Sequence, residues 1–204
     1  MGKDYQYYDD VNSYAVVPGK MKTSVNKLKP FVKELGSFGK FKNDIYRSPG
    51  RLDEHLDFCA ANAAKIIAID EQIIVSAIST DVDVAILLRF NLKSVSTKNL
   101  KVDDRLLSIN SYGTYEDANN FAQIDLVEGP QSTRLYSICY PVIADFVTSD
   151  NEALKATTSK ISDTEWKRLD ILTDIALNSE KYIRDGNPYL SWHAPMKKIS
   201  NSSN

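Results

Sequence analysis

The middle of the chain has the hydrophobic pattern of a β-sheet. Runs rich in β-branched residues occupy positions 65–69, 72–79 and 82–90, and the short polar pairs Asp70-Glu71 and Thr80-Asp81 separate them. Strand-forming runs joined by two-residue turns are typical of hairpins. This pattern therefore predicts a meander of antiparallel strands.

The strand pattern continues through the next sixty residues. Three further apolar runs lie at 105–110, 121–127 and 134–147, with turn signals at Asp103-Asp104, Tyr112-Gly113 and Gly129-Pro130. Pro141 lies inside the last run and cannot donate a ladder hydrogen bond, so that strand should be an edge strand or carry a bulge. Six strands at this spacing indicate a small sandwich or barrel.

The pattern changes to a helical period near the C-terminus. Ser162 and Glu165 have the spacing of a capping box, and Gly186 is a natural stop, so we expect a long helix over about 163–185. Basic residues near its end would complement the helix dipole; they are Lys181 and Arg184. Its apolar face would hold Trp166, Leu169, Leu172, Ala176 and Ile183, widened by Ile171 and Ile175.

Two shorter helices are expected before the sheet. Residues 53–64 are rich in alanine and share an apolar stripe formed by Leu52, Leu56, Cys59 and Ala63. Helical spacing also links Val25, Leu28, Val32 and Leu35. Because Pro30 would interrupt that helix, we expect a short helix from about Pro30 or two kinked turns.

Together these elements predict an α+β protein. Its centre would be an antiparallel β sandwich or barrel of about six strands, with a long C-terminal helix and a basic N-terminal arm. We expect three regions. Residues 1–51 form a tail and a loosely structured basic arm, 52–160 a mainly β core with a leading helix, and 161–204 the C-terminal helix, an anchored irregular stretch (187–195) and a polar tail from 196.

Charge is distributed unevenly along the 204 residues. The whole chain carries 25 basic and 27 acidic residues, yet residues 20–51, which we call the basic arm, hold nine basic residues against Glu34 and Asp44. The arm is therefore strongly positive and the remainder acidic, which favours an adhesive segment beside an acidic body. The nine are Lys20, Lys22, Lys27, Lys29, Lys33, Lys40, Lys42, Arg47 and Arg51.

Composition excludes several classes of protein. No apolar run approaches the roughly 18 residues of a membrane span, and the acidic, tyrosine-rich start resembles neither a signal nor a transit peptide. We therefore expect no membrane insertion and a location in the cytoplasm, or in a particle assembled there. Cys59 and Cys139 are too few for a disulfide framework and should be buried thiols.

Candidate catalytic chemistry is sparse. His55 and Cys59 are four residues apart on the predicted helix, and Cys139 and His193 could complete a metal site, but this spacing matches no zinc motif. A buried cysteine and a surface histidine are the simpler interpretation. The pair Asp81 and Asp83 should be solvated strand ends, and the phosphate-binding glycine motifs are missing from the sequence. We predict no cofactor and no metal.

These observations favour a non-enzymatic structural or adaptor subunit of a larger assembly, for instance a virion or similar particle. The basic arm and tails would contact other protein subunits in a homo- or hetero-oligomer. A nucleic-acid-binding protein that stacks bases on Phe38, Phe41 and Tyr46 is the second hypothesis, and an enzyme using His55, Cys59 and His193 is the third. The predicted partner-binding residues are Lys27, Lys29, Lys33, Phe38, Lys40, Phe41, Lys42, Arg47 and Trp192.

Overall fold

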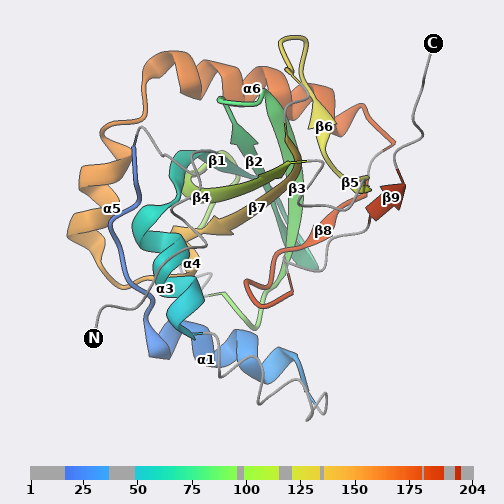
Figure 1. Ribbon diagram of the computed structural model, residues 1–204. Coiled ribbons are helices and arrows are strands. Elements are labelled where there is room, and N and C mark those ends of the chain that lie inside the picture. The colour runs from blue at the N-terminus through green and yellow to red at the C-terminus, as the bar shows by residue number, and fades with distance from the viewer. Residues whose placement is uncertain are drawn as a thin grey trace.

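The computed structural model describes residues 17–36, 49–95, 99–114, 121–133, 136–180, 182–190 and 196–198. They form an α+β fold around one curled antiparallel sheet (Figure 1), so the predicted class is confirmed. The strand order is β6-β3-β2-β1-β4-β7, and β8 lies parallel to β3 on the same edge as β6. The strands are β1 (Ala60–Ile69), β2 (Gln72–Ser79), β3 (Val84–Asn91), β4 (Arg105–Thr114), β5 (Phe121–Gln123), β6 (Val127–Glu128), β7 (Tyr136–Ile143), β8 (Arg184–Asp185) and β9 (Met196–Lys198).

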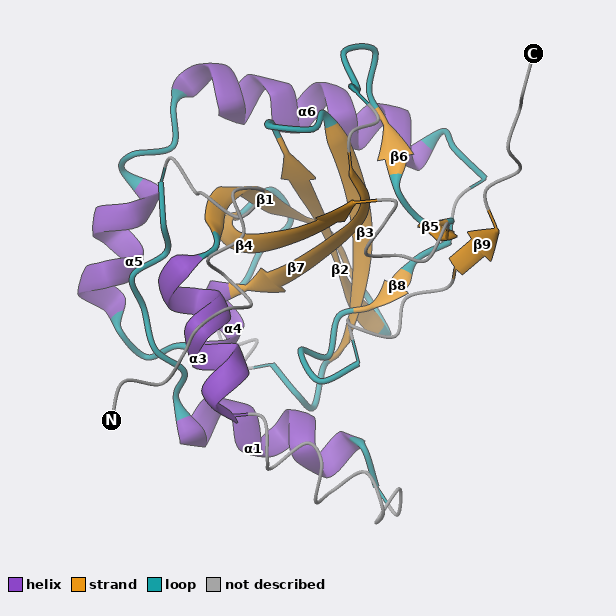
Figure 2. Ribbon diagram, viewed as in Figure 1, coloured by secondary structure: helices purple, strands orange, loops and turns teal. Residues whose placement is uncertain are grey.

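Helices surround the sheet, as Figure 2 shows. In that view α6 crosses the top of the molecule and α1 lies at the bottom, with α3 and α5 at the left. The helices are α1 (Val25–Glu34), α3 (Pro49–Phe58), α4 (Ala144–Val147), α5 (Asn151–Thr158) and α6 (Asp163–Leu177).

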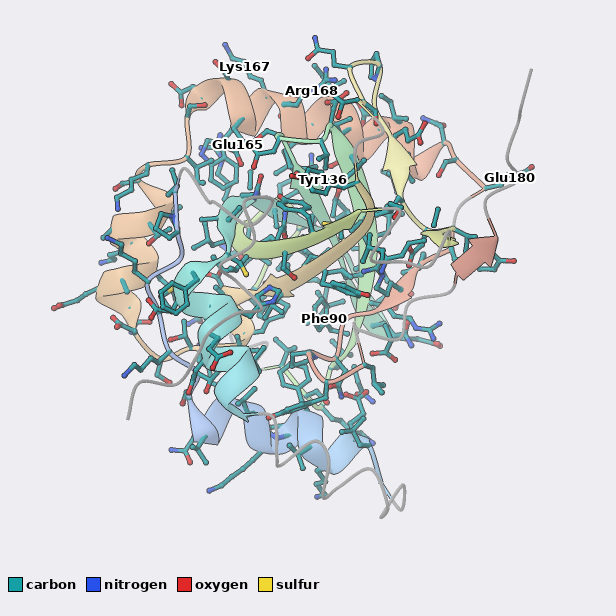
Figure 3. All side chains as sticks on the ribbon, in the orientation of Figure 1. Phe90, Tyr136, Glu165, Lys167, Arg168 and Glu180 are labelled. Atoms are coloured by element: carbon teal, nitrogen blue, oxygen red, sulfur yellow. The ribbon has the colours of Figure 1, made fainter. Side chains whose placement is uncertain are left out.

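Both faces of the central strands are covered. Lys65 pairs with Ser76 across β1 and β2, so their side chains share a face, and Thr173 of α6 bonds Ser76 Oγ at 2.8 Å. Phe90, on the other face, packs edge-to-face against Phe146 of α4 and Phe31 of α1, and Figure 3 labels it on the side of α1. Burial on both faces explains why β2 and β3 are almost continuously apolar rather than alternating.

Side chains link the two edges of the curled sheet. Arg184 of β8 donates through Nε and Nη2 to the two carboxylate oxygens of Asp125, both at 2.7 Å. Its Nη1 donates to the Cys139 carbonyl of β7 at 2.6 Å, and Nη2 also donates to Gln123 Oε1 at 2.8 Å. Gln123 Oε1 in turn accepts from the Cys139 amide at 2.9 Å. One buried arginine thus connects the β3 edge to the β7 edge.

Several predicted strands are confirmed. The predicted run 72–79 is β2, and β7 is an edge strand at the end of the sheet, as Pro141 required. The predicted strand 121–127 is instead two short strands, β5 and β6, interrupted by a turn. The run 134–147 ends as a strand at Ile143 and continues as α4.

The alanine-rich segment after Phe58 was assigned wrongly. It begins β1 at Ala60, and the helix before it runs from Pro49 to Phe58 rather than over 53–64. Alanine favours helices, but the pairing of Ala60 with Asn110 and Ala64 with Ala77 places this segment in the sheet. Small side chains suit the first five residues of β1, which are all buried, because they leave room for the elements packed on them.

Helix α6 starts as predicted and stops earlier. Ser162 Oγ accepts from the Glu165 amide at 3.1 Å, and the helix ends at Leu177 instead of near residue 185. Asn178 and Ser179 terminate it by bonding their side chains to the carbonyls of Asp174 and Ala176. Arg184 therefore does not complement a helix end, because its side chain is buried beside Asp125.

Two terminal segments also differ from expectation. Helix α1 begins at Val25 and contains Pro30, so the predicted start at Pro30 is wrong. Near the other end, β9 pairs in antiparallel register with β5, where the sequence indicated only a polar tail. In the stretch 187–195, which the sequence predicts to be irregular but anchored, Asn187 is buried and its Oδ1 accepts from the Tyr189 amide at 3.1 Å, while residues 191–195 lie outside the described residues.

Candidate interaction surface on helix α1

Helix α1 lies in the part of the basic arm that the structure describes. It packs against the body of the protein, whereas the sequence predicted a loosely structured arm. Leu28 and Phe31 are buried against the body, and Asn187 Nδ2 donates to the Phe31 carbonyl at 3.0 Å. Burying two such side chains contributes about 3–6 kcal/mol, which offsets the roughly 3 kcal/mol cost of Pro30 inside a helix. Tertiary burial therefore explains why this helix forms despite its proline.

Polar contacts fix both ends of α1. The Ser24 amide donates to the Val147 carbonyl at 2.7 Å ahead of the helix. At its end, Glu34 Oε2 accepts from Ser94 Oγ at 2.8 Å. These contacts orient the helix on the body, so that one of its faces is turned outward.

Lys27 belongs to this anchoring, not to the outer face. Its Nζ donates to the Asp145 carbonyl at 2.7 Å. Partial burial lowers the pKa of Lys27, and the nearby Asp145 carboxylate opposes that shift. Burial also raises the pKa of Asp145, whose Oδ2 accepts from the Leu107 amide at 2.8 Å. Of the three α1 lysines predicted to bind a partner, Lys27 is thus occupied within the fold.

The outward side of α1 combines positive charge with an apolar group. Val25 is 71% exposed, although the sequence placed it on the buried stripe. Lys29 and Lys33 are exposed at positions four and eight residues further along, so the three side chains form one ridge. Lys22 is exposed just ahead of the helix. We call Lys22, Val25, Lys29 and Lys33 the α1 outer face.

The remaining predicted partner-binding residues cannot be placed with α1. Phe38, Lys40, Phe41, Lys42, Arg47 and Trp192 lie outside the described residues, as do Tyr46 and His193. The structure therefore places Lys29 and Lys33 together on one surface and assigns Lys27 to the interior side.

Of the three residues proposed for catalysis, the two that the structure describes, His55 and Cys59, lie in the core. His55 is fully buried rather than on a helix surface, and it donates from Nε2 to the Ile109 carbonyl at 2.7 Å. Burial lowers the pKa of His55 to about 4, so the imidazole is neutral at physiological pH. Burial has the opposite effect on the two cysteines, because it disfavours the thiolate. It raises the pKa of Cys59 and that of Cys139, the latter to about 12, and neither cysteine forms a disulfide. A protonated thiol is a poor nucleophile and metal ligand.

Of the Asp81 and Asp83 pair, Asp81 is exposed as predicted, whereas Asp83 is not a solvated strand end. Asp83 is buried in the turn between β2 and β3 with a φ of 54°, and Arg168 of α6 donates to its carboxylate at 2.7 and 2.6 Å. The Gln131 amide donates to the same carboxylate at 2.7 Å. Asp83 therefore joins α6 to the β2–β3 turn and the loop after β6, which is a structural role.

A second outward surface, on α6 and the segment after it, does not follow from the sequence pattern. Ile171, Asp174 and Leu177 are exposed and follow one another at three-residue spacing along α6, so they form a ridge. Beyond the helix, Glu180, Tyr182 and Ile183 are also exposed, and Leu177 and Tyr182 expose 56% and 62% of their surface. We call these six residues the α6 patch. In Figure 3, Glu180 lies beyond the end of α6, on the segment that follows the helix. The assumption that the helix continued to residue 185 concealed this patch.

The chain matches no known family model, no curated protein and no solved structure. Among the described residues, none of the helices has the length and apolar character needed to cross a membrane. The same part of the chain holds no cluster of three or more histidine, cysteine or acidic side chains placed to bind a metal ion.

Proposed function

We propose that this protein is a non-enzymatic structural or adaptor subunit of a larger protein assembly, of the kind that a virion or similar particle contains. The α1 outer face is its contact surface for another protein. The observation that carries the proposal is the combination of a firmly anchored helix with an exposed Val25 between lysines.

An apolar centre with a charged surround is typical of protein interfaces. Binding to phosphates requires positive charge alone, and the 71% exposed valine adds nothing to it. Because the helix is already ordered on the body, a partner would not have to supply the free energy of folding it. These two features favour a protein partner over nucleic acid.

Nucleic-acid binding through the same lysines is the second candidate. Lys22, Lys29 and Lys33 are exposed on one side of α1, and such a cluster could neutralise backbone phosphates. A suitable experiment must therefore identify the class of molecule that touches this face, not only detect an association.

Site-specific photo-cross-linking makes that identification. A photoreactive amino acid replaces Val25 in the full chain, expressed in its source cells, and cross-linked material is analysed by mass spectrometry. The matched control places the same group at Val102, a valine that is 50% exposed in the turn before β4. We expect adducts with a specific protein from position 25 and none from position 102. Adducts with nucleic acid would establish the second candidate, and equal labelling from both positions would refute the proposal.

A further inference from the structure

The α1 outer face and the α6 patch are complementary in character. The first presents Lys29 and Lys33 with Val25, and the second presents Asp174 and Glu180 with exposed apolar side chains. On α1 the charged neighbours of Val25 are the lysines, and on α6 the acidic neighbours Asp174 and Glu180 lie around Leu177, while the exposed Lys167 lies one turn before Ile171. Opposite charge around matching apolar groups steers association and suppresses mispairing.

The two surfaces lie at opposite ends of the molecule. In Figure 1, α1 is at the bottom and α6 at the top, with the whole sheet between them. One copy therefore cannot bring its own α1 onto its own α6. A second copy can, and it would leave its opposite surface open for a third.

We infer that the α1 outer face of one copy binds the α6 patch of the next copy, head to tail. This inference rests on the proposed function, because it names the partner of the same α1 surface. Contacts between two different surfaces are heterologous, and they generate a ring or an open filament instead of stopping at a dimer.

The spacing of side chains supports a helix-to-helix contact. Val25, Lys29 and Lys33 form a ridge at four-residue spacing, and Ile171, Asp174 and Leu177 form one at three-residue spacing. A four-residue ridge packing beside a three-residue ridge is the commonest geometry of nearly aligned helices. With Val25 against Ile171, the ion pair of Lys29 with Asp174 follows within one turn, since the two steps rise about 6 and 4.5 Å along their axes.

Neither surface is needed by its own fold. Within the described part of the chain, the Lys29 side chain donates to Asn26 of the same helix, at 3.3 Å and in an exposed position, and to no other residue. Asp174 contributes its backbone carbonyl to the helix end, and its side chain is exposed. Charge reversal at these positions should therefore change association without unfolding the body, and thermal unfolding of each variant checks this.

Sedimentation velocity of the purified full chain tests the inference with a charge swap. The variants are K29E/K33E, D174K/E180K and the four changes combined, each measured over a range of protein concentrations. Runs at salt concentrations on the order of 50 and 500 mM show how far association depends on attraction between exposed charges, which the higher salt concentration screens. The control K101E/K160E reverses two exposed lysines that belong to neither surface.

We expect the wild type and the control to form species larger than a dimer at low salt. Each double variant should raise the apparent dissociation constant at least about 10-fold, and the combined variant should restore association because both charge sets are exchanged. A monomeric wild type, association that stops at a dimer, or failure of the combined variant to recover would overturn the inference. If the purified chain is monomeric while position 25 cross-links a different protein in cells, the second copy is refuted and the proposed function stands. If both experiments are negative, both are refuted.

Discussion

Removing Asp125 should destabilise the protein more than removing any surface charge. The carboxylate is fully buried, accepts two hydrogen bonds from Arg184, and belongs to the network that links the two edges of the sheet. In the Asp125→Ala variant the guanidinium stays buried without its counter-ion. Loss of one partner of a buried ion pair costs about 3–5 kcal/mol, so we expect a decrease of that size in the free energy of unfolding.

The double variant D125L/R184M separates the charge effect from the loss of volume. It leaves no buried charge, and its remaining cost is the loss of donors to Gln123 Oε1 and to the Cys139 carbonyl, about 1–3 kcal/mol. The double variant should therefore be more stable than Asp125→Ala. Asp170→Ala is the surface control. It removes the carboxylate that pairs with Lys65, and because the Asp170 side chain is 66% exposed, the change should lower the free energy of unfolding by at most about 1 kcal/mol.

Urea titration measures these differences directly. Fluorescence of the buried Trp166 and far-UV circular dichroism follow unfolding, and the free energy is extrapolated to water. At about 2–4 °C per kcal/mol for a chain of this length, Asp125→Ala should lower Tm by roughly 6–20 °C. If Asp125→Ala cost no more than Asp170→Ala, the reasoning that Arg184 holds the sheet edges together would be wrong.

Three further predictions concern the core. Burial lowers the pKa of His55 to about 4 from an unfolded value near 6.5, so the unfolded chain binds more protons between these pH values. The free energy of unfolding of the wild type should therefore decrease by up to about 3 kcal/mol as pH falls from 6.5 to 4. Urea titration of His55→Gln should not show that decrease. Phe31→Ala should cost about 3–5 kcal/mol in the same assay and increase proteolysis within residues 24–36, whereas uniform protection there would contradict the packing of α1. Cys59 and Cys139, whose pKa values burial raises, should resist an aromatic disulfide reagent at pH 8 until urea unfolds the chain, and rapid labelling of the native protein would contradict their placement.

The local pattern of the sequence predicted the middle of the sheet well. In β2 the strand-forming run is flanked by turn residues, so pattern and tertiary pairing agree. In Ala60–Ala64 they disagree, because alanine prefers helices and the strand is imposed by its neighbours β2 and β4. Helix α1 shows the same override, since burial of Phe31 outweighs the proline next to it.

Long-range polar contacts were not predictable from the sequence. Arg184 follows Lys181 in what looked like a helix end, yet its partners Asp125 and Gln123 lie about sixty residues away. Asp83 is likewise explained by Arg168, 85 positions further along. The sequence predicted the positive charge of the α1 outer face. Which residues of α1 face outward depends on the burial of Leu28 and Phe31 on the opposite side of the helix. The α6 patch depends on where the helix stops.

The native size of the protein in its source cells shows whether the α1 outer face joins it to other proteins. Gel filtration of gently lysed cells, with and without nuclease, would compare the wild-type chain with K29E/K33E and with the control K101E/K160E. We expect the wild type and the control to elute far above the 22.9 kDa of one chain regardless of nuclease, and K29E/K33E to elute as a much smaller species. Identical elution of the wild type and K29E/K33E would contradict the claim that the α1 outer face assembles this protein with others.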